Sequence, residues 1–162
     1  MSPRKHQSPG AVRRRGGCTL RQARAASLGR QKGSATTQFP ASTLNPLRAL
    51  DEVNARGFNV LPGELGENIT TRGVDLLGLP TGARLQIGEE AVVEVTGLRS
   101  PCVQVNTFQE GLLEAVIERR KGVGLVRKTG VMSVVIRRGV IRNGDAIEVR
   151  LPDGPHEPLA PV

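Results

Sequence analysis

The chain has 162 residues, enough for one domain of ordinary size, and its 38% hydrophobic and 23% charged residues are typical of a globular protein. No apolar run approaches the roughly 18 residues that span a bilayer, and no secretory signal opens the chain, so we expect no membrane contact. Cys18 and Cys102 lie too far apart for a disulfide framework, which predicts a reducing, cytoplasmic location.

The net charge of +8 comes entirely from the first third of the chain. Residues 1–50 hold ten Lys and Arg and no Asp or Glu, whereas residues 51–162 hold thirteen basic and fifteen acidic residues, a balance of −2. Residues 1–45 also lack any apolar period, so we predict a disordered basic tail that contributes no strand up to about residue 43.

The composition of this tail is compatible with more than a disordered segment. It is rich in Arg and Ser and has no acidic residue, which is also typical of an organelle transit peptide, and a mis-assigned start would look the same. Non-specific nucleic-acid binding is a weaker alternative, because no aromatic residues are interleaved with the basic ones.

Order is predicted over residues 46–162. Asn45 is expected to cap a helix over 47–56, whose apolar residues share one face and which Gly57 ends. Three short segments rich in β-branched residues follow, and the last two form a predicted hairpin. These segments cover residues 68–71, 84–87 and 91–96.

The second half of the domain starts with a helix predicted over 108–121, where apolar residues recur with helical spacing. Strands are expected at 131–136, 139–141 and 146–151, and the Pro-rich residues 152–162 are a tail or a strap. Short strands at close spacing, with one or two helices, favour a mainly β, barrel-like domain over a βαβ sheet.

Cys102 is a candidate reactive residue. It lies directly after a predicted strand, where Pro101 ends the ladder, and Arg99 three residues earlier favours the thiolate. The thiolate is the form that ligates soft metals or accepts sulfur. An inert, buried small hydrophobe is the alternative for a lone cysteine.

A glycine-punctuated turn leads into the first of these strands. Backbone N–H groups around Gly63 and Gly66 could form an anion-binding nest, with Asn68 and Thr70 as side-chain donors. Glu67 could act as a general acid or base, or orient an arginine. An ordinary turn with locally satisfied side chains is the alternative, and the residue types alone favour it.

Several blocks of sequence, in order over about a hundred residues, together resemble the MOSC domain, the C-terminal domain of molybdenum-cofactor sulfurases. Residues 63–73 look like the family's Gly-Glu-Asn-Leu-Thr block, and residues 94–102 resemble the segment that carries its characteristic cysteine. The other matching blocks are 79–88, 127–132 and Gly144-Asp145.

The resemblance implies a MOSC-type β-barrel that binds the molybdenum cofactor (molybdopterin). It implies an oxidoreductase that acts on N-hydroxylated or similar small compounds and receives electrons from a partner. Cys102 would be the catalytic residue and metal ligand, and Glu67, Asn68, Thr70 and Arg99 would bind the cofactor. A non-catalytic carrier or binding module for sulfur or cofactor is the alternative.

Two departures from the family accompany the resemblance. Cofactor sulfurases fuse this domain to a pyridoxal-phosphate module, for which the chain has no room, so no bound pyridoxal phosphate is expected. Full-length relatives also begin with further strands, for which residues 1–45 show no counterpart. A barrel without those strands would stay open and lack part of the cofactor pocket.

Overall fold

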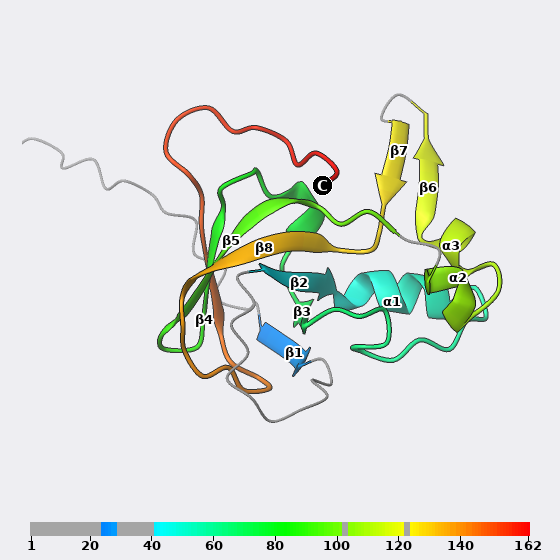
Figure 1. The fold of residues 1–162 in the computed structure, drawn as a ribbon, viewed down its shortest axis with the longest axis horizontal. Coiled ribbons are helices and arrows are strands. Elements are labelled where there is room, and N and C mark those ends of the chain that lie inside the picture. Colours follow the sequence, from blue (N-terminus) through cyan, green and yellow to red (C-terminus); the bar gives the residue numbers. More distant parts are fainter. Residues whose placement is uncertain (1–23, 29–40, 102–103, 122–123) are drawn as a thin grey trace, which may run out of the picture.

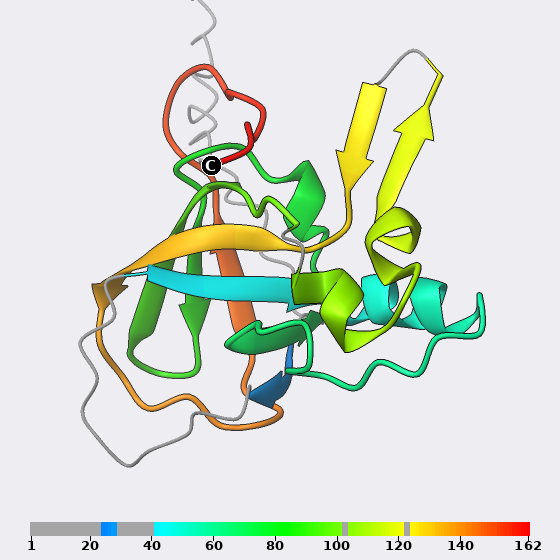
Figure 2. The same ribbon diagram turned by 45° about the vertical axis from the view of Figure 1, so that its right-hand side comes forward.

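The computed structural model describes residues 24–28, 41–101, 104–121 and 124–162. A curled sheet forms most of the molecule, a small helical region lies beside it, and a β-hairpin projects from that region (Figures 1 and 2). The predicted mainly β, barrel-like fold is confirmed. Among the described residues, no helix is long and apolar enough to cross a membrane.

In chain order the elements are β1 (Arg24–Leu28), β2 (Ala41–Pro46), α1 (Leu47–Asn54), β3 (Ile69–Arg72), the 3-10 helix η1 (Leu76–Gly78), β4 (Arg84–Ile87), β5 (Ala91–Leu98), α2 (Gln104–Phe108), α3 (Leu112–Ala115), β6 (Ile117–Arg120), β7 (Gly124–Arg127), β8 (Val131–Arg137) and β9 (Ile147–Arg150). Among the described residues, seven strands form the main sheet in the order β1-β3-β2-β8-β5-β4-β9, and β6 and β7 form a separate two-stranded sheet. All pairs are antiparallel except β2 with β3.

Two strands lie in the segment that was predicted to be a tail. β1 pairs with β3, and β2 lies between β3 and β8. The prediction that residues 1–43 contribute no strand is therefore wrong for residues 24–28, which form β1, and for residues 41–43, which begin β2. The segment Arg-Ala-Ala-Ser-Leu has too little hydrophobic contrast to show a period, but its backbone pairs with β3 and its Ala25 is buried. The rest of the predicted tail lies outside the described residues.

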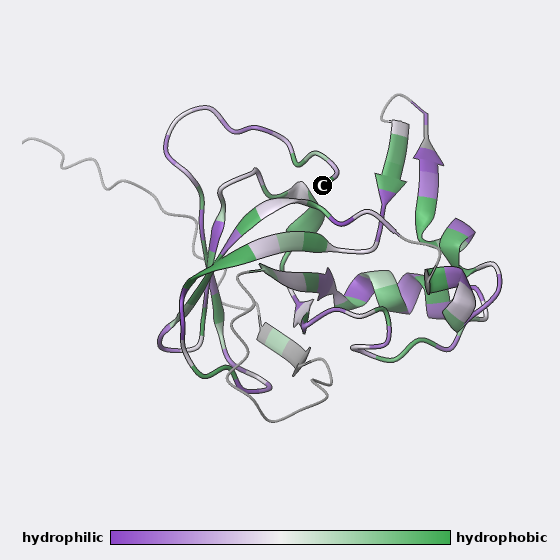
Figure 3. Ribbon diagram, in the orientation of Figure 1, coloured by the Kyte–Doolittle hydropathy of each residue, from purple (hydrophilic) through white to green (hydrophobic). Residues whose placement is uncertain are grey.

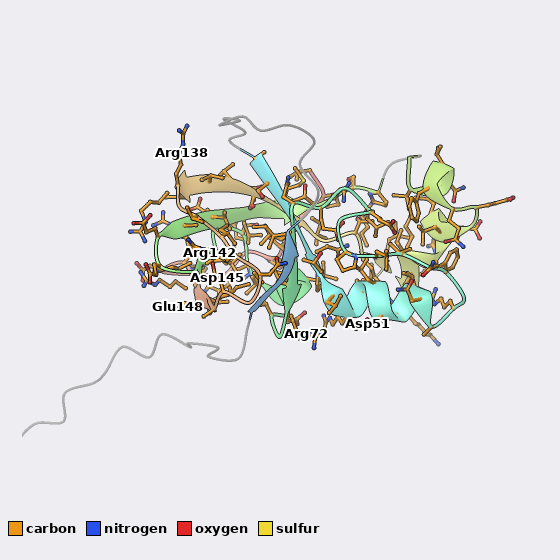
Figure 4. The ribbon with its side chains drawn as sticks, turned by 90° about the horizontal axis from the view of Figure 1, so that it is seen from below. Asp51, Arg72, Arg138, Arg142, Asp145 and Glu148 are labelled. Carbon is orange, nitrogen blue, oxygen red and sulfur yellow. The ribbon has the colours of Figure 1, made fainter. Side chains whose placement is uncertain are left out.

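β1 also brings the two edges of the sheet toward each other. The Ala25 N–H donates to the Asp145 carbonyl (2.9 Å), and the Gly144 N–H donates to the Ala25 carbonyl (2.7 Å), just before β9 begins. Seen from below in Figure 4, Asp145 and Glu148 lie at one end of the molecule, and Asp51 of α1 lies toward the other. Residues 1–45 therefore do supply an upstream strand, β1, and it contributes to closing the barrel.

Alternation along the strands builds the barrel core. Every second residue of β5 from Ala91 to Gly97 is buried, and hydrophobic residues recur along β5 and β8 (Figure 3). Leu44, Leu85, Ile87, Val95 and Val131 are fully buried there. The predicted hairpin of residues 84–96 is confirmed as β4–β5, and the strands predicted at 68–71, 131–136 and 146–151 are confirmed as β3, β8 and β9 within one or two residues.

Two predicted elements are wrong. The helix expected over 108–121 is replaced by α3 and β6, after α2 ends at Phe108, because Gly111 turns the chain in the left-handed region (φ +79°) and β6 pairs with the antiparallel strand β7. Residues 139–141 form no strand, and Gly139 lies so close to the start of β5 that a Cβ there would be 2.5 Å from the Ala91 nitrogen. The helix after Asn45 is confirmed but ends at Asn54, two residues earlier than predicted, with Ala55 as its C-cap, and Gly57 (φ +95°) lies in the turn that follows.

A second hydrophobic core fills the helical region. Leu50 and Val53 of α1 meet Val60, Val105 and Leu112 there. Lys128 fixes the base of the β6–β7 hairpin to this region, because its Nζ lies 2.5 Å from Glu52 Oε2 and 2.7 Å from Glu118 Oε2.

The C-terminal residues form a strap rather than a free tail. The Leu98 N–H donates to the Ala160 carbonyl (2.8 Å), and the Val162 N–H donates to the Leu98 carbonyl (3.1 Å). Pro158 bridges to Pro80, and Leu159 packs on the barrel core. The strap therefore holds the end of β5, from which Arg99 continues.

Candidate functional site

A buried polar cluster lies where the barrel meets the helical region. Leu44 and Ile69 are register partners whose side chains enter the barrel core, so the next pair, Asn45 and Thr70, share the opposite face of the sheet. Asn45 and Thr70 are fully buried, and Glu67 is 2% exposed. A polar group in such a place needs a hydrogen-bond partner, because an unsatisfied one costs about 1–3 kcal/mol.

The turn before β3 is organised around Glu67. Its Oε1 accepts from the Gly63 N–H (2.8 Å) and from the Thr70 hydroxyl (3.0 Å). Gly63 and Gly66 have φ values of +90° and +80°, a backbone conformation that favours glycine. The second carboxylate oxygen of Glu67, Oε2, is buried and has no hydrogen-bond partner among the described residues.

Asn68 fixes this turn to β2. Its N–H donates to the Thr43 carbonyl (2.9 Å), and its Oδ1 accepts from the Thr43 N–H (2.7 Å). The side chain thus extends the parallel β2–β3 pairing by one position. Asn68 lies in the predicted site, but its side-chain oxygen Oδ1 already accepts a hydrogen bond from the backbone of Thr43.

Arg99 reaches the same cluster from the end of β5. Its N–H donates to the Gly130 carbonyl (3.0 Å), and its own carbonyl accepts from the Thr129 hydroxyl (2.8 Å). One guanidinium nitrogen, Nη2, lies beside Gly66, where a Cβ would be 3.3 Å away. The other, Nη1, is buried without a hydrogen-bond partner among the described residues.

Gly130 makes this arrangement sterically achievable. A Cβ on Gly130 would overlap the Leu44 carbonyl oxygen and lie 3.0 Å from the Asn45 Cα. The residue also has φ +90°. Only glycine therefore lets the chain pass so close to β2 while it holds Arg99.

The sequence does not indicate Asn45 as a site residue, because its position before Pro46 and an apolar helical pattern predicts a helix cap instead. The structure places it in β2, and the N-cap of α1 is Pro46, with no side-chain cap hydrogen bond. Both polar atoms of its amide, Oδ1 and Nδ2, are buried and have no partner in the described part of the chain. No local signal could have shown this, because it depends on which strands β2 joins.

Cys102, the predicted catalytic residue and metal ligand, lies outside the described residues, as does Val103. The preceding Pro101 and Arg99 are described, so the segment that leads to Cys102 starts at the polar cluster. In the described residues, no group of three or more His, Cys, Asp or Glu side chains could hold a metal ion. The structure thus brings Glu67, Thr70 and Arg99 together and leaves the role of Cys102 as a prediction.

A pocket of about 230 Å³ lies apart from this cluster, between α1, η1 and β7. Its charged side chains are already paired: Arg48 Nη2 with Asp75 Oδ1 (2.5 Å), and Lys128 with Glu52. Neither Glu67 nor Arg99 lines it. The polar cluster is the better candidate site, because its donors and acceptors are the ones without partners.

The cluster has the chemistry of a ligand-binding site. Arg99 Nη1 carries positive charge and can only donate, Glu67 Oε2 can accept, and the Asn45 amide can do both. These groups suit a ligand that has an anionic part and a hydrogen-bonding edge.

Comparisons with known proteins agree with this architecture. The profile of the MOSC domain matches residues 31–148. YiiM from Geobacillus stearothermophilus is 24% identical, with a TM-score of 0.55, over 67% of this chain and 53% of that one. The YUAD protein from Bacillus subtilis is 18% identical, with a TM-score of 0.57, over 85% of this chain and 94% of that one. YiiM from Escherichia coli is 20% identical, with a TM-score of 0.53, over 85% of this chain and 67% of that one.

These similarities define the fold and the family. The chain spans about half the length of the Geobacillus YiiM, and at such identities the solved structures establish the fold alone. No curated protein matches the chain. The profile match covers most of the chain. The chain therefore belongs to the MOSC domain family.

Proposed function

We propose that the buried polar cluster binds the molybdenum cofactor and that the protein is an oxidoreductase acting on N-hydroxylated or similar small compounds. The observation that carries the proposal is that four of the five buried side-chain atoms without hydrogen-bond partners among the described residues belong to this cluster: Asn45 Oδ1 and Nδ2, Glu67 Oε2 and Arg99 Nη1. In a family associated with this cofactor, a site with both anion-binding and hydrogen-bonding groups supports binding of a phosphorylated pterin.

The residues present fit such a ligand. Arg99 would hold the phosphate, since its Nη1 is buried without a partner among the described residues and a guanidinium is suited to phosphate oxygens. Glu67 and Thr70 would lie beside the pterin, and Cys102, which follows Arg99 in the sequence, would ligate the metal as a thiolate. The bound molybdenum would supply two-electron redox chemistry, with electrons from a separate partner.

The alternative is a carrier that holds sulfur or cofactor for another protein. It needs the same cluster and the same thiolate but no turnover. We place either activity in the cytoplasm, because the two cysteines lie far apart in the sequence and a reactive thiol requires reducing conditions.

Metal and sulfur analysis of the purified full chain tests both functions. Stoichiometric molybdenum that is lost in Cys102→Ser supports the oxidoreductase, whereas a persulfide without metal supports the carrier. Cys18→Ser is the matched control and should change neither. Full molybdenum loading of Cys102→Ser would contradict the ligand assignment, and wild-type protein with neither molybdenum nor persulfide would contradict both functions.

A further inference from the structure

We propose that Asn45 and Glu67 together recognise the 2-amino-4-oxopyrimidine edge of the pterin ring, while Arg99 is left for the anionic end of the ligand. The inference rests on the proposed function and specifies which part of the ligand each group contacts. Its basis is the placement of two buried side chains: the Asn45 amide, which has no hydrogen-bond partner among the described residues, and the Glu67 carboxylate, of which only Oε1 has partners there.

Asn45 is an unusual core residue. Its relative exposure is 0%, and both amide atoms lack a hydrogen-bond partner among the described residues. A leucine of similar size would avoid the cost of burying these atoms. An amide in this position is explained if a ligand supplies the missing partners.

Thr70 connects Asn45 to Glu67. Thr70 is the register partner of Asn45 across the parallel pair, so the two side chains are neighbours on the same face. Its hydroxyl donates to Glu67 Oε1, which leaves Oε2 as the oxygen available to a ligand. A free acceptor on Glu67 and a free donor and acceptor on Asn45 therefore belong to one continuous group of side chains.

The pterin edge has the complementary pattern. The ring N3–H and the 2-amino group donate, and the 4-oxo group accepts. Glu67 Oε2 can accept from the donors, and the Asn45 Nδ2 can donate to the 4-oxo group. Arg99 has donors only, so it cannot accept from the N–H groups and is suited instead to phosphate.

A pair of matched ligands tests this assignment on the full chain. 6-Hydroxymethylpterin and 6-hydroxymethyllumazine differ in that the 2-amino donor is an oxo acceptor in the lumazine. Both ligands fluoresce, and the chain has no Trp or Tyr to interfere, so binding can be followed by ligand fluorescence. We expect the wild type to prefer the pterin by about tenfold, the effect of one hydrogen bond in a buried site.

Three variants separate recognition from stability. Glu67→Gln, which gains a donor, should reduce or reverse the preference for the pterin. Asn45→Leu should weaken the binding of both ligands about tenfold without lowering the melting temperature, because it removes unsatisfied atoms. Thr71→Val is the matched control: its hydroxyl is also buried without a partner in the described residues, but it follows Thr70 and so lies on the opposite face.

Equal wild-type affinity for the two ligands, or an Asn45→Leu variant that binds both as the wild type does, would overturn the inference. If the wild type still loads molybdenum in that case, the proposed function stands and only the assignment of the pterin edge fails. If the wild type binds neither millimolar pterin nor the molybdenum cofactor, both proposals fail together.

Discussion

The guanidinium of Arg99 lies against Gly66, so closely that a Cβ on Gly66 would be 3.3 Å from Nη2. Gly66 belongs to the turn that carries Glu67, and Arg99 continues from β5. The contact therefore joins the two segments of the polar cluster and sets where the guanidinium can lie.

We expect Gly66→Ala to displace Arg99 and to lower molybdenum loading severalfold. Gly57→Ala is the matched control, since Gly57 also has a positive φ (+95°) but nothing within 4 Å of its Cβ position. Both variants should lose about 1–2 kcal/mol of stability from the left-handed backbone. Molybdenum content after cofactor loading distinguishes them, and equal loading of the two variants would show that the Gly66–Arg99 contact is unimportant.

Gly97→Ala should release the C-terminal strap. A Cβ on Gly97 would lie 2.7 Å from both the Ala160 carbonyl oxygen and Val162 Cγ1, so one of these segments must move. We expect a loss of about 1–3 kcal/mol, as for other overpacked sites, measured by denaturant unfolding. The same substitution in a chain lacking residues 155–162 should cost much less, because the clash is gone. Equal costs in the two chains would place the strain elsewhere.

Lys128→Met should weaken the attachment of the β6–β7 hairpin. Burial lowers the pKa of Lys128, but the hydrogen bonds with Glu118 and Glu52 outweigh it, so the pKa lies above its usual 10.5. The stabilising contribution is then complete below pH 10.5 and is lost as pH rises through the higher folded-state pKa. Because the Glu52 side chain is 47% exposed, we expect Lys128→Met to lower the free energy of unfolding by only about 1–2 kcal/mol at neutral pH.

The measurement for Lys128 is the free energy of unfolding of wild type and variant between pH 7 and pH 12. The difference between them should stay constant to about pH 10 and then shrink. Lys121→Met, at an exposed lysine near the other end of the hairpin, should show no such difference. A difference that grows with pH would contradict the direction of the pKa shift.

Ala25→Asp should destabilise the barrel if β1 belongs to it. Ala25 is 1% exposed in the barrel core, and an unpaired carboxylate there should cost about 3 kcal/mol or more. Arg72→Ala, on the exposed end of the neighbouring β3, is the control and should change stability by less than about 0.5 kcal/mol. Thermal unfolding measures the stability of both variants. An Ala25→Asp variant as stable as the wild type would show that residues 24–28 are not part of the barrel.

The sequence alone determined the elements whose signals are local. Spacing of apolar residues and a following glycine predicted α1, and two short segments rich in β-branched residues predicted the β4–β5 hairpin. The block around Glu67 and the segment from Arg99 to Cys102 were predicted as parts of the candidate site, because the resemblance to the family lies in those short stretches, and the structure brings Glu67 and Arg99 together. These features are encoded within about ten residues each.

Only the tertiary structure decided the features that depend on distant partners. β1 has little hydrophobic contrast and exists through its pairing with β3, and β6 is a strand rather than the end of a helix because β7 pairs with it. Asn45 became a site residue because β2 places it beside Thr70, twenty-five positions away in the chain. Local periodicity reports which face of a segment is buried, whereas strand pairing between remote segments decides what that face meets.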